Sequence, residues 1–277
     1  MSAGSAIAED PWRSLRSLTT ARIAQGRCGG SLPTQPMLEF ELARARARDA
    51  VHLPLAFAFA FDAQAMARLA PNGAELIHVH SAAPSRDIYL RRPDLGRRLD
   101  PTSRARLEAL PGAARQPDIV FVVADGLSAL AAHRHALTVF TLASGALRAA
   151  DWQVAPLVVG EQARVALGDE IGEVLGARQV AMLIGERPGL STADSLGIYL
   201  TFAPRPGRND AERNCISNIH PDGGLGYAQA AHKLVWLAHE ARRRQLTGVL
   251  LKDDSETYLR DSNAHWQREG FIKIAST

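Results

Sequence analysis

The sequence predicts an α/β protein in which a helical N-terminal segment precedes a Rossmann-like, mostly parallel sheet covered by helices. Two observations carry this prediction. From about residue 75 onward, short apolar runs typical of buried strands alternate with stretches of helical periodicity. Before that point, capping residues and apolar spacing indicate helices. The length of 277 residues is compatible with one or two domains, and 46% hydrophobic residues suffice for a sizeable core.

The N-terminal part, residues 1–74, is expected to be a helical arm that contacts a partner. Pro11 suits the first turn of a helix, and the apolar spacing that follows predicts a helix ending by Gly26. A second helix is expected to begin at Thr34. Phenylalanines alternate with alanines in residues 53–61, which favours a strand, and residues 62–69 have a helical pattern.

Residues 75–248 are expected to form the α/β domain. The clearest strand is Ile119–Ala124, because a continuous β-branched and aromatic run is typical of a strand buried on both faces. Asp125-Gly126 breaks this run, and Ser128 can cap a helix that begins at Ala129. Further strands are expected at 75–81, 156–160, 179–184 and 197–202, and further helices at 169–175 and 227–244.

Charge and composition exclude several classes of protein. All but three of the 32 basic residues are arginines, but 29 acidic residues balance them to a net charge of +3, so no nucleic-acid partner is expected. The longest apolar runs are too short for a membrane span, so no membrane is expected either. The first residues show no secretory signal. Two cysteines cannot form a disulfide framework, which favours a reducing compartment.

Signatures of phosphate-binding loops, catalytic serines and metal sites are missing from the sequence. Polar residues do follow two predicted strands, at the ends where α/β sheets usually bind ligands. For Asp125 a turn with a helix cap is the favoured interpretation, and for Glu186 an ion pair with Arg187 is as good as a ligand contact. Cys215 is interpreted as a small buried apolar residue, which is the commonest environment of a cysteine. It has no base at catalytic spacing, so it is not interpreted as a nucleophile. No catalytic residue and no metal ligand is predicted.

Six sequence blocks, each weak alone, follow one another in order between about residues 10 and 245. They are Thr20–Arg27, Tyr89–Leu99, Asp125–Ser128, Asp169–Ala177, Gly185–Leu190 and Cys215–His220. As an ordered set they are specific. Together they resemble the small (light) subunit of ethanolamine ammonia-lyase.

The resemblance implies an adenosylcobalamin-dependent lyase that converts ethanolamine to acetaldehyde and ammonia. In that family the large subunit is a (β/α)₈ barrel that binds ethanolamine, and cobalamin lies between the two subunits of a hetero-oligomer. Positions matching Val165, Glu186 and Cys215 contact the cobalamin. The sequence lacks D-x-H-x-x-G, the motif that supplies a histidine to cobalt in other cobalamin enzymes. Its absence fits base-on binding, with the cofactor's own base on the metal.

The chain is therefore expected to be a non-catalytic subunit that supplies one wall of the cofactor site. Its N-terminal helices and the arginine-rich residues 89–99 are expected to face the large subunit. The expected location is the cytoplasm, and some relatives lie inside a bacterial microcompartment. Two alternatives stay open: a stand-alone α/β nucleotide-binding enzyme with Asp125 and Glu186 in its site, and a scaffold that touches no cofactor. Residues 53–73 and the tail 249–277 depart from the family pattern.

Overall fold

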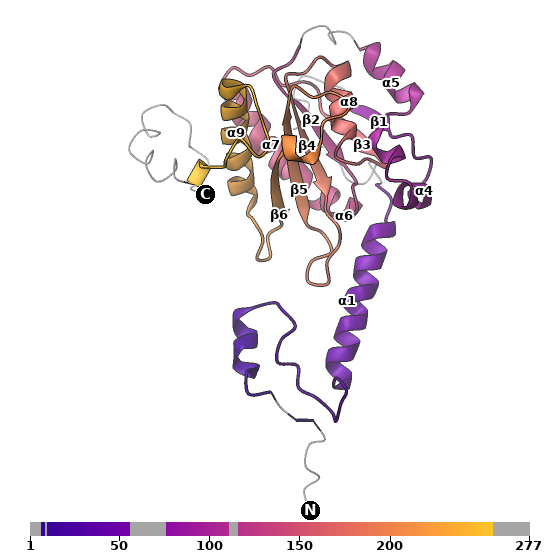
Figure 1. Ribbon diagram of the computed structural model, residues 1–277, viewed down its shortest axis with the longest axis vertical. Coiled ribbons are helices and arrows are strands. Elements are labelled where there is room, and N and C mark those ends of the chain that lie inside the picture. Colours follow the sequence, from indigo (N-terminus) through magenta and orange to yellow (C-terminus); the bar gives the residue numbers. More distant parts are fainter. Residues whose placement is uncertain (1–6, 9, 56–75, 111–115, 257–277) are drawn as a thin grey trace, which may run out of the picture.

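The computed structural model describes residues 7–8, 10–55, 76–110 and 116–256. An N-terminal arm contains a 3-10 helix, η1 (Arg13–Leu18), and a long helix, α1 (Thr34–His52). Figure 1 shows α1 projecting from the α/β part, with the residues that precede it lying away from the sheet. From residue 56 onward, the strand and helix predicted within residues 53–69 lie outside the described residues, as does the tail beyond residue 256.

Six strands form one sheet in the order β1-β3-β2-β4-β5-β6. The parallel strands are β1 (Ile77–His80), β3 (Val158–Glu161), β2 (Val120–Ala124) and β4 (Gln179–Gly185). Strand β5 (Leu196–Phe202) runs antiparallel to β4, and β6 (Asn214–Ile219) runs antiparallel to β5. The predicted mostly parallel sheet is confirmed, with an antiparallel pair added at one edge.

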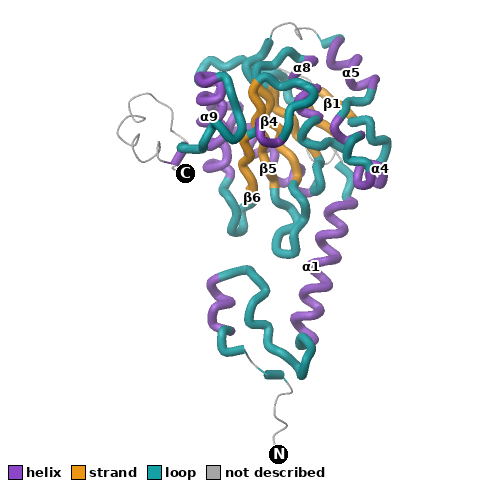
Figure 2. The backbone as a smooth tube through the Cα atoms, in the orientation of Figure 1, coloured by secondary structure: helices purple, strands orange, loops and turns teal. Residues whose placement is uncertain are grey.

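Helices cover both sides of this sheet (Figure 2). On one side, α5 (Pro101–Glu108) packs on β1 and on α8 (Leu167–Val174), and α8 packs on β4. On the other side, α9 (Tyr227–Arg244) packs on β5, β6 and α7 (Leu137–Ala149). Helix α7 continues from α6 (Ala129–Ala131) through a π-helical turn, η4 (Ala132–Ala136). The remaining short helices are α4 (Arg86–Arg91), η2 (Leu95–Arg97) and η5 (Asp210–Glu212).

The predicted helix from Pro11 to Gly26 is wrong beyond the 3-10 turn. No residue of η1 is buried, so no packing offsets the cost of starting a helix. Ala24 and Gly26 then adopt left-handed backbone angles, with φ of 49° and 76°, which a right-handed helix does not tolerate. None of the helices in the described ranges is long and apolar enough to cross a membrane.

Strand β6 is not predicted by the sequence pattern. Its buried residues, Ile216 and Ile219, are three positions apart instead of two. The pairing with β5 is irregular between Leu196 and Ile198, and this bulge returns Ile219 to the core side. The strand therefore lacks the period-2 alternation by which a half-buried strand is recognised.

Candidate functional site

The two sides of the antiparallel edge of the sheet differ in how they are packed. Helix α9 packs against the side of β5 and β6 that carries Ile198 and Ile216. On the opposite side Tyr199 pairs with Cys215, and the first is half-buried while the second is exposed. We name the surface of Gly197, Tyr199 and Cys215, on the side of these strands away from α9, the open face.

Glu186 reaches the open face from the end of β4. Its Oε2 accepts hydrogen bonds from the Ser195 hydroxyl and from the Asn218 backbone N–H at 3.2 Å. A Cβ atom at Gly197 would lie 2.9 Å from Oε1. The carboxylate therefore lies directly over Gly197, where the missing side chain provides the space for it. Oε1 accepts no hydrogen bond from the described residues, and none of their ion pairs joins Glu186 to Arg187. One acceptor of this carboxylate is thus available to a ligand.

Cys215 and Tyr199 are neutral groups on this face. Desolvation raises the pKa of the Cys215 thiol, a hydrogen bond with Tyr199 opposes that rise, and the Glu186 carboxylate adds to it. Burial likewise raises the pKa of the Tyr199 phenol, with Cys215 contributing. The thiol is therefore not activated as a nucleophile. The expectation that Cys215 is buried is wrong, because β6 turns this side chain away from α9.

Val165 lies on the loop between β3 and α8, at the same end of the sheet as Glu186. It is half-buried against the core cluster that Tyr199 also contacts. This loop follows the carboxyl end of a parallel strand, where α/β sheets bind ligands. The structure therefore brings Glu186 and Cys215 together and places Val165 at the same end of the sheet, two strands away from the strand that Glu186 follows.

Asp125, at the end of β2, is not part of the open face. Its carboxylate is fully buried and accepts hydrogen bonds from the backbone N–H groups of Gln162 and Ala163, both at 2.9 Å. The guanidinium of Arg86 donates to it at 3.1 Å. Burial raises the pKa of Asp125 to about 6, although Arg86 and the amide donors oppose the rise. Because the chain's own donors occupy this carboxylate, it does not suit the ligand role that the stand-alone enzyme would need.

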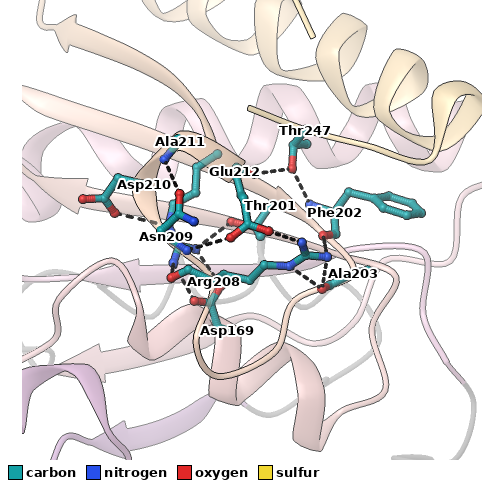
Figure 3. A network of polar contacts seen from close by, with 11 residues as sticks. Asp169, Thr201, Phe202, Ala203, Arg208, Asn209, Asp210, Ala211, Glu212 and Thr247 are labelled. Carbon is teal, nitrogen blue, oxygen red and sulfur yellow. Dashed lines mark hydrogen bonds and ion pairs between the residues drawn. The ribbon is translucent and has the colours of Figure 1, made fainter. Parts of the chain in front are cut away.

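A network of polar contacts lies where β5 connects to β6, and it includes Asp169 of α8 and Thr201 of β5 (Figure 3). Arg213, two residues before Cys215, forms a bidentate ion pair with Asp169 of α8. Both N···O distances are 2.6 Å and both side chains are 1% exposed. Arg213 also donates to the Thr201 hydroxyl and the Arg208 carbonyl, each at 2.9 Å. The network ties the start of β6 to β5 and to α8.

Comparisons with known proteins agree on one family. The profile of the ethanolamine ammonia-lyase light chain matches residues 9–252. The ethanolamine ammonia-lyase small subunit of Ralstonia nicotianae is 54% identical over 257 residues, which cover 91% of this chain and 92% of the relative. That of Azotobacter vinelandii is 55% identical over 259 residues, covering 92% and 93%. That of Pseudomonas aeruginosa is 53% identical over 260 residues, covering 94% and 93%.

These matches confirm the resemblance seen in the six sequence blocks. They extend across almost the whole described structure, including the loops of Val165 and Glu186 and the strand of Cys215. The chain therefore belongs to the ethanolamine ammonia-lyase small-subunit, or light-chain, family.

Proposed function

We propose that this chain forms one wall of an adenosylcobalamin site at its interface with the large, (β/α)₈-barrel subunit of a hetero-oligomeric ethanolamine ammonia-lyase. The enzyme converts ethanolamine to acetaldehyde and ammonia, and the large subunit binds the ethanolamine. The observation that carries the proposal is the open face. There, a carboxylate with an available acceptor, Glu186, lies beside an exposed thiol, Cys215, in a chain of this family.

The residues of the open face fit a corrin. A corrin is a broad ring edged with amide side chains, so it needs an accessible surface with hydrogen-bonding groups at its rim. Oε1 of Glu186 can accept an amide N–H, and the small side chain of Cys215 permits close approach of the ring edge. Val165 adds apolar surface on the loop that follows β3. Adenosylcobalamin supplies the radical chemistry when it is bound, and these three residues bind and orient it.

The proposal assigns no catalytic residue to this chain. The thiol and phenol of the open face have raised pKa values, so neither is activated as an anionic nucleophile, and we assign them the role of contact surface. Because the D-x-H-x-x-G motif is missing from this chain, we propose base-on binding of the cofactor. The free thiols of Cys28 and Cys215 suit a reducing cytoplasm, inside or outside a microcompartment.

The N-terminal arm and residues 89–99 are proposed as the surfaces that contact the large subunit. The arm exposes several large apolar side chains, which mark interaction surfaces when they gather. In residues 89–99, Tyr89 is buried while the arginines around it extend into solvent, where they can make forked contacts. Exposed residues of these two surfaces include Trp12, Leu18, Leu38, Leu42, Arg91, Arg92, Arg97 and Arg98.

Glu186→Ala is expected to weaken cobalamin binding by the assembled two-subunit enzyme about tenfold, because one hydrogen bond to a charged acceptor is lost. Equilibrium dialysis of the purified complex against cyanocobalamin, read by its visible absorbance, measures this change. Glu173→Ala is the control, since Glu173 is an exposed carboxylate on α8, and it is expected to leave the affinity unchanged.

Two outcomes would overturn the proposal. Unchanged affinity in an intact Glu186→Ala complex would favour a scaffold that touches no cofactor. Acetaldehyde formation by this chain alone, supplied with adenosylcobalamin and ethanolamine, would contradict the absence of a catalytic role.

A further inference from the structure

The turn Asp125–Ser128 lies between the two loops that carry Val165 and Glu186. It connects β2 to α6, and β2 pairs with β3 on one side and with β4 on the other. The loop of Val165 follows β3, and the loop of Glu186 follows β4. The proposed function gives this turn no role, but its contacts extend to both loops.

On the β3 side, the contact is made by the Asp125 carboxylate. Oδ2 accepts the N–H of Gln162 and Oδ1 accepts the N–H of Ala163, both at 2.9 Å. Gln162 has a φ of 53°, a left-handed conformation that is costly for a residue with a side chain. The carboxylate holds this costly conformation three residues before Val165, and so determines where that loop leaves β3.

On the β4 side, the contact is made by the backbone of the same turn. The N–H of Leu127 donates to the carbonyl of Gly185 at 2.9 Å. The approach is so close that a Cβ atom on Gly126 would lie 2.2 Å from that carbonyl oxygen. Gly185 directly precedes Glu186, so the turn also fixes the origin of the Glu186 loop.

Arg86 of α4 joins a third element to the turn. Its guanidinium donates to Asp125 at 3.1 Å, to the Gly126 carbonyl at 2.9 Å and to the Val51 carbonyl of α1 at 2.7 Å. Its side chain is 11% exposed, so these contacts are largely shielded from water. The charge of Asp125 is therefore balanced at the point where α1 meets the sheet.

We propose that Asp125 is a positioning residue for the cofactor wall. Its carboxylate holds the Val165 loop against the turn that anchors the Glu186 loop, and it thereby sets the separation of these two cofactor contacts. Being fully buried, Asp125 touches no cofactor itself. This inference rests on the proposed function and adds a residue that acts through Val165 and Glu186.

The test is Asp125→Asn, which keeps the size of the side chain but removes its charge and one of its acceptors. In the assembled complex, the dissociation constant for cyanocobalamin is expected to rise about fivefold, as for the loss of one buried hydrogen bond. The apparent KM for adenosylcobalamin should rise with it, while kcat at saturating cofactor stays within about twofold of the unmodified enzyme.

Asp118→Asn is the matched control. Asp118 lies before the opposite end of β2, is also buried, and accepts the N–H of Gln153 at 3.0 Å. The control loses an equivalent contact at the edge of the sheet remote from the cofactor loops. Both variants are expected to melt at lower temperature, and only Asp125→Asn to lose cobalamin affinity.

Equal affinity losses in the two variants, or an effect confined to kcat, would overturn the inference. If Asp125→Asn does not fold, Arg86→Lys gives a second test, because lysine keeps the charge but loses the forked contacts. The apparent KM for adenosylcobalamin is again expected to rise while kcat stays unchanged. A loss in Asp125→Asn with none in Glu186→Ala would overturn the proposed Glu186 contact and restrict the positioning role to the Val165 loop. The reverse result would overturn the positioning role alone.

Discussion

Arg213→Ala is expected to lower the free energy of unfolding by about 3–5 kcal/mol, because it leaves the buried carboxylate of Asp169 without its bidentate partner. The Thr201 hydroxyl and the Arg208 carbonyl lose a donor in the same step. Urea denaturation of the purified full-length chain, followed by circular dichroism, measures the loss. An effect of this size would show that the ion pair holds β6 to α8.

Arg134→Ala is the matched control. Arg134 makes one ion pair, with Asp194, and its side chain is largely exposed; such pairs contribute about 0–1 kcal/mol. Replacing both buried charges with apolar residues, as in Asp169→Leu combined with Arg213→Met, is expected to recover most of the lost stability. A loss in Arg213→Ala no larger than in Arg134→Ala would contradict the role given to the buried pair.

Gly185→Ala is expected to lower the free energy of unfolding by at least about 3 kcal/mol, as severe overpacking does. A Cβ atom there would lie 1.9 Å from the carbonyl oxygen of Ser128 and 2.6 Å from that of Asp125. Both are backbone atoms, so the whole turn between β2 and α6 would have to move. Thermal denaturation and the yield of folded chain measure the effect.

The same substitution at Gly145 provides the comparison. Gly145 is in α7 with nothing within 4 Å of an added Cβ, so alanine there is expected to stabilise the helix by about 0.5–1 kcal/mol. The two Gly→Ala variants should therefore shift the melting temperature in opposite directions. A melting temperature for Gly185→Ala equal to that of the unmodified chain would contradict the close backbone packing at the end of β4.

Elements whose burial is evident from their own residue pattern were predictable from the sequence. Strand β2 is buried at every position, and its continuous apolar run indicates burial on both faces. Helix α9 spans the expected residues because its buried side chains recur at helical spacing. The hydroxyl of Ser128 caps α6 as predicted, accepting the N–H of Ala131. In each case the signal lies within a few residues of the element it determines.

Features that depend on a distant partner were not predictable from local patterns. The run of β5 shows which residues are buried but not that it pairs antiparallel to β4. The exposure of Cys215 depends on α9 covering only one side of β6. Arg213 and Asp169 lie 44 positions apart, and nothing around either indicates the other.

The same distinction between local signals and distant partners applies to the candidate site. The family resemblance indicated Val165, Glu186 and Cys215, but their arrangement depends on sheet register. Glu186 reaches the Asn218 amide across 32 positions of sequence. For Asp125, a turn and a helix cap were correctly expected, but its carboxylate binds a loop that only the pairing of β2 with β3 brings near.

Strand β6 closes the sheet at one edge and is the final strand of the described chain. A polypeptide that ends before β6 would contain Val165 and Glu186. It would lack Cys215, the backbone N–H of Asn218 and the ion pair of Arg213. These contacts join residues 32 and 44 positions apart, so the intervening loops must close before they can form. On the proposed function, a fragment that ends before β6 is therefore expected not to form the complete cobalamin wall.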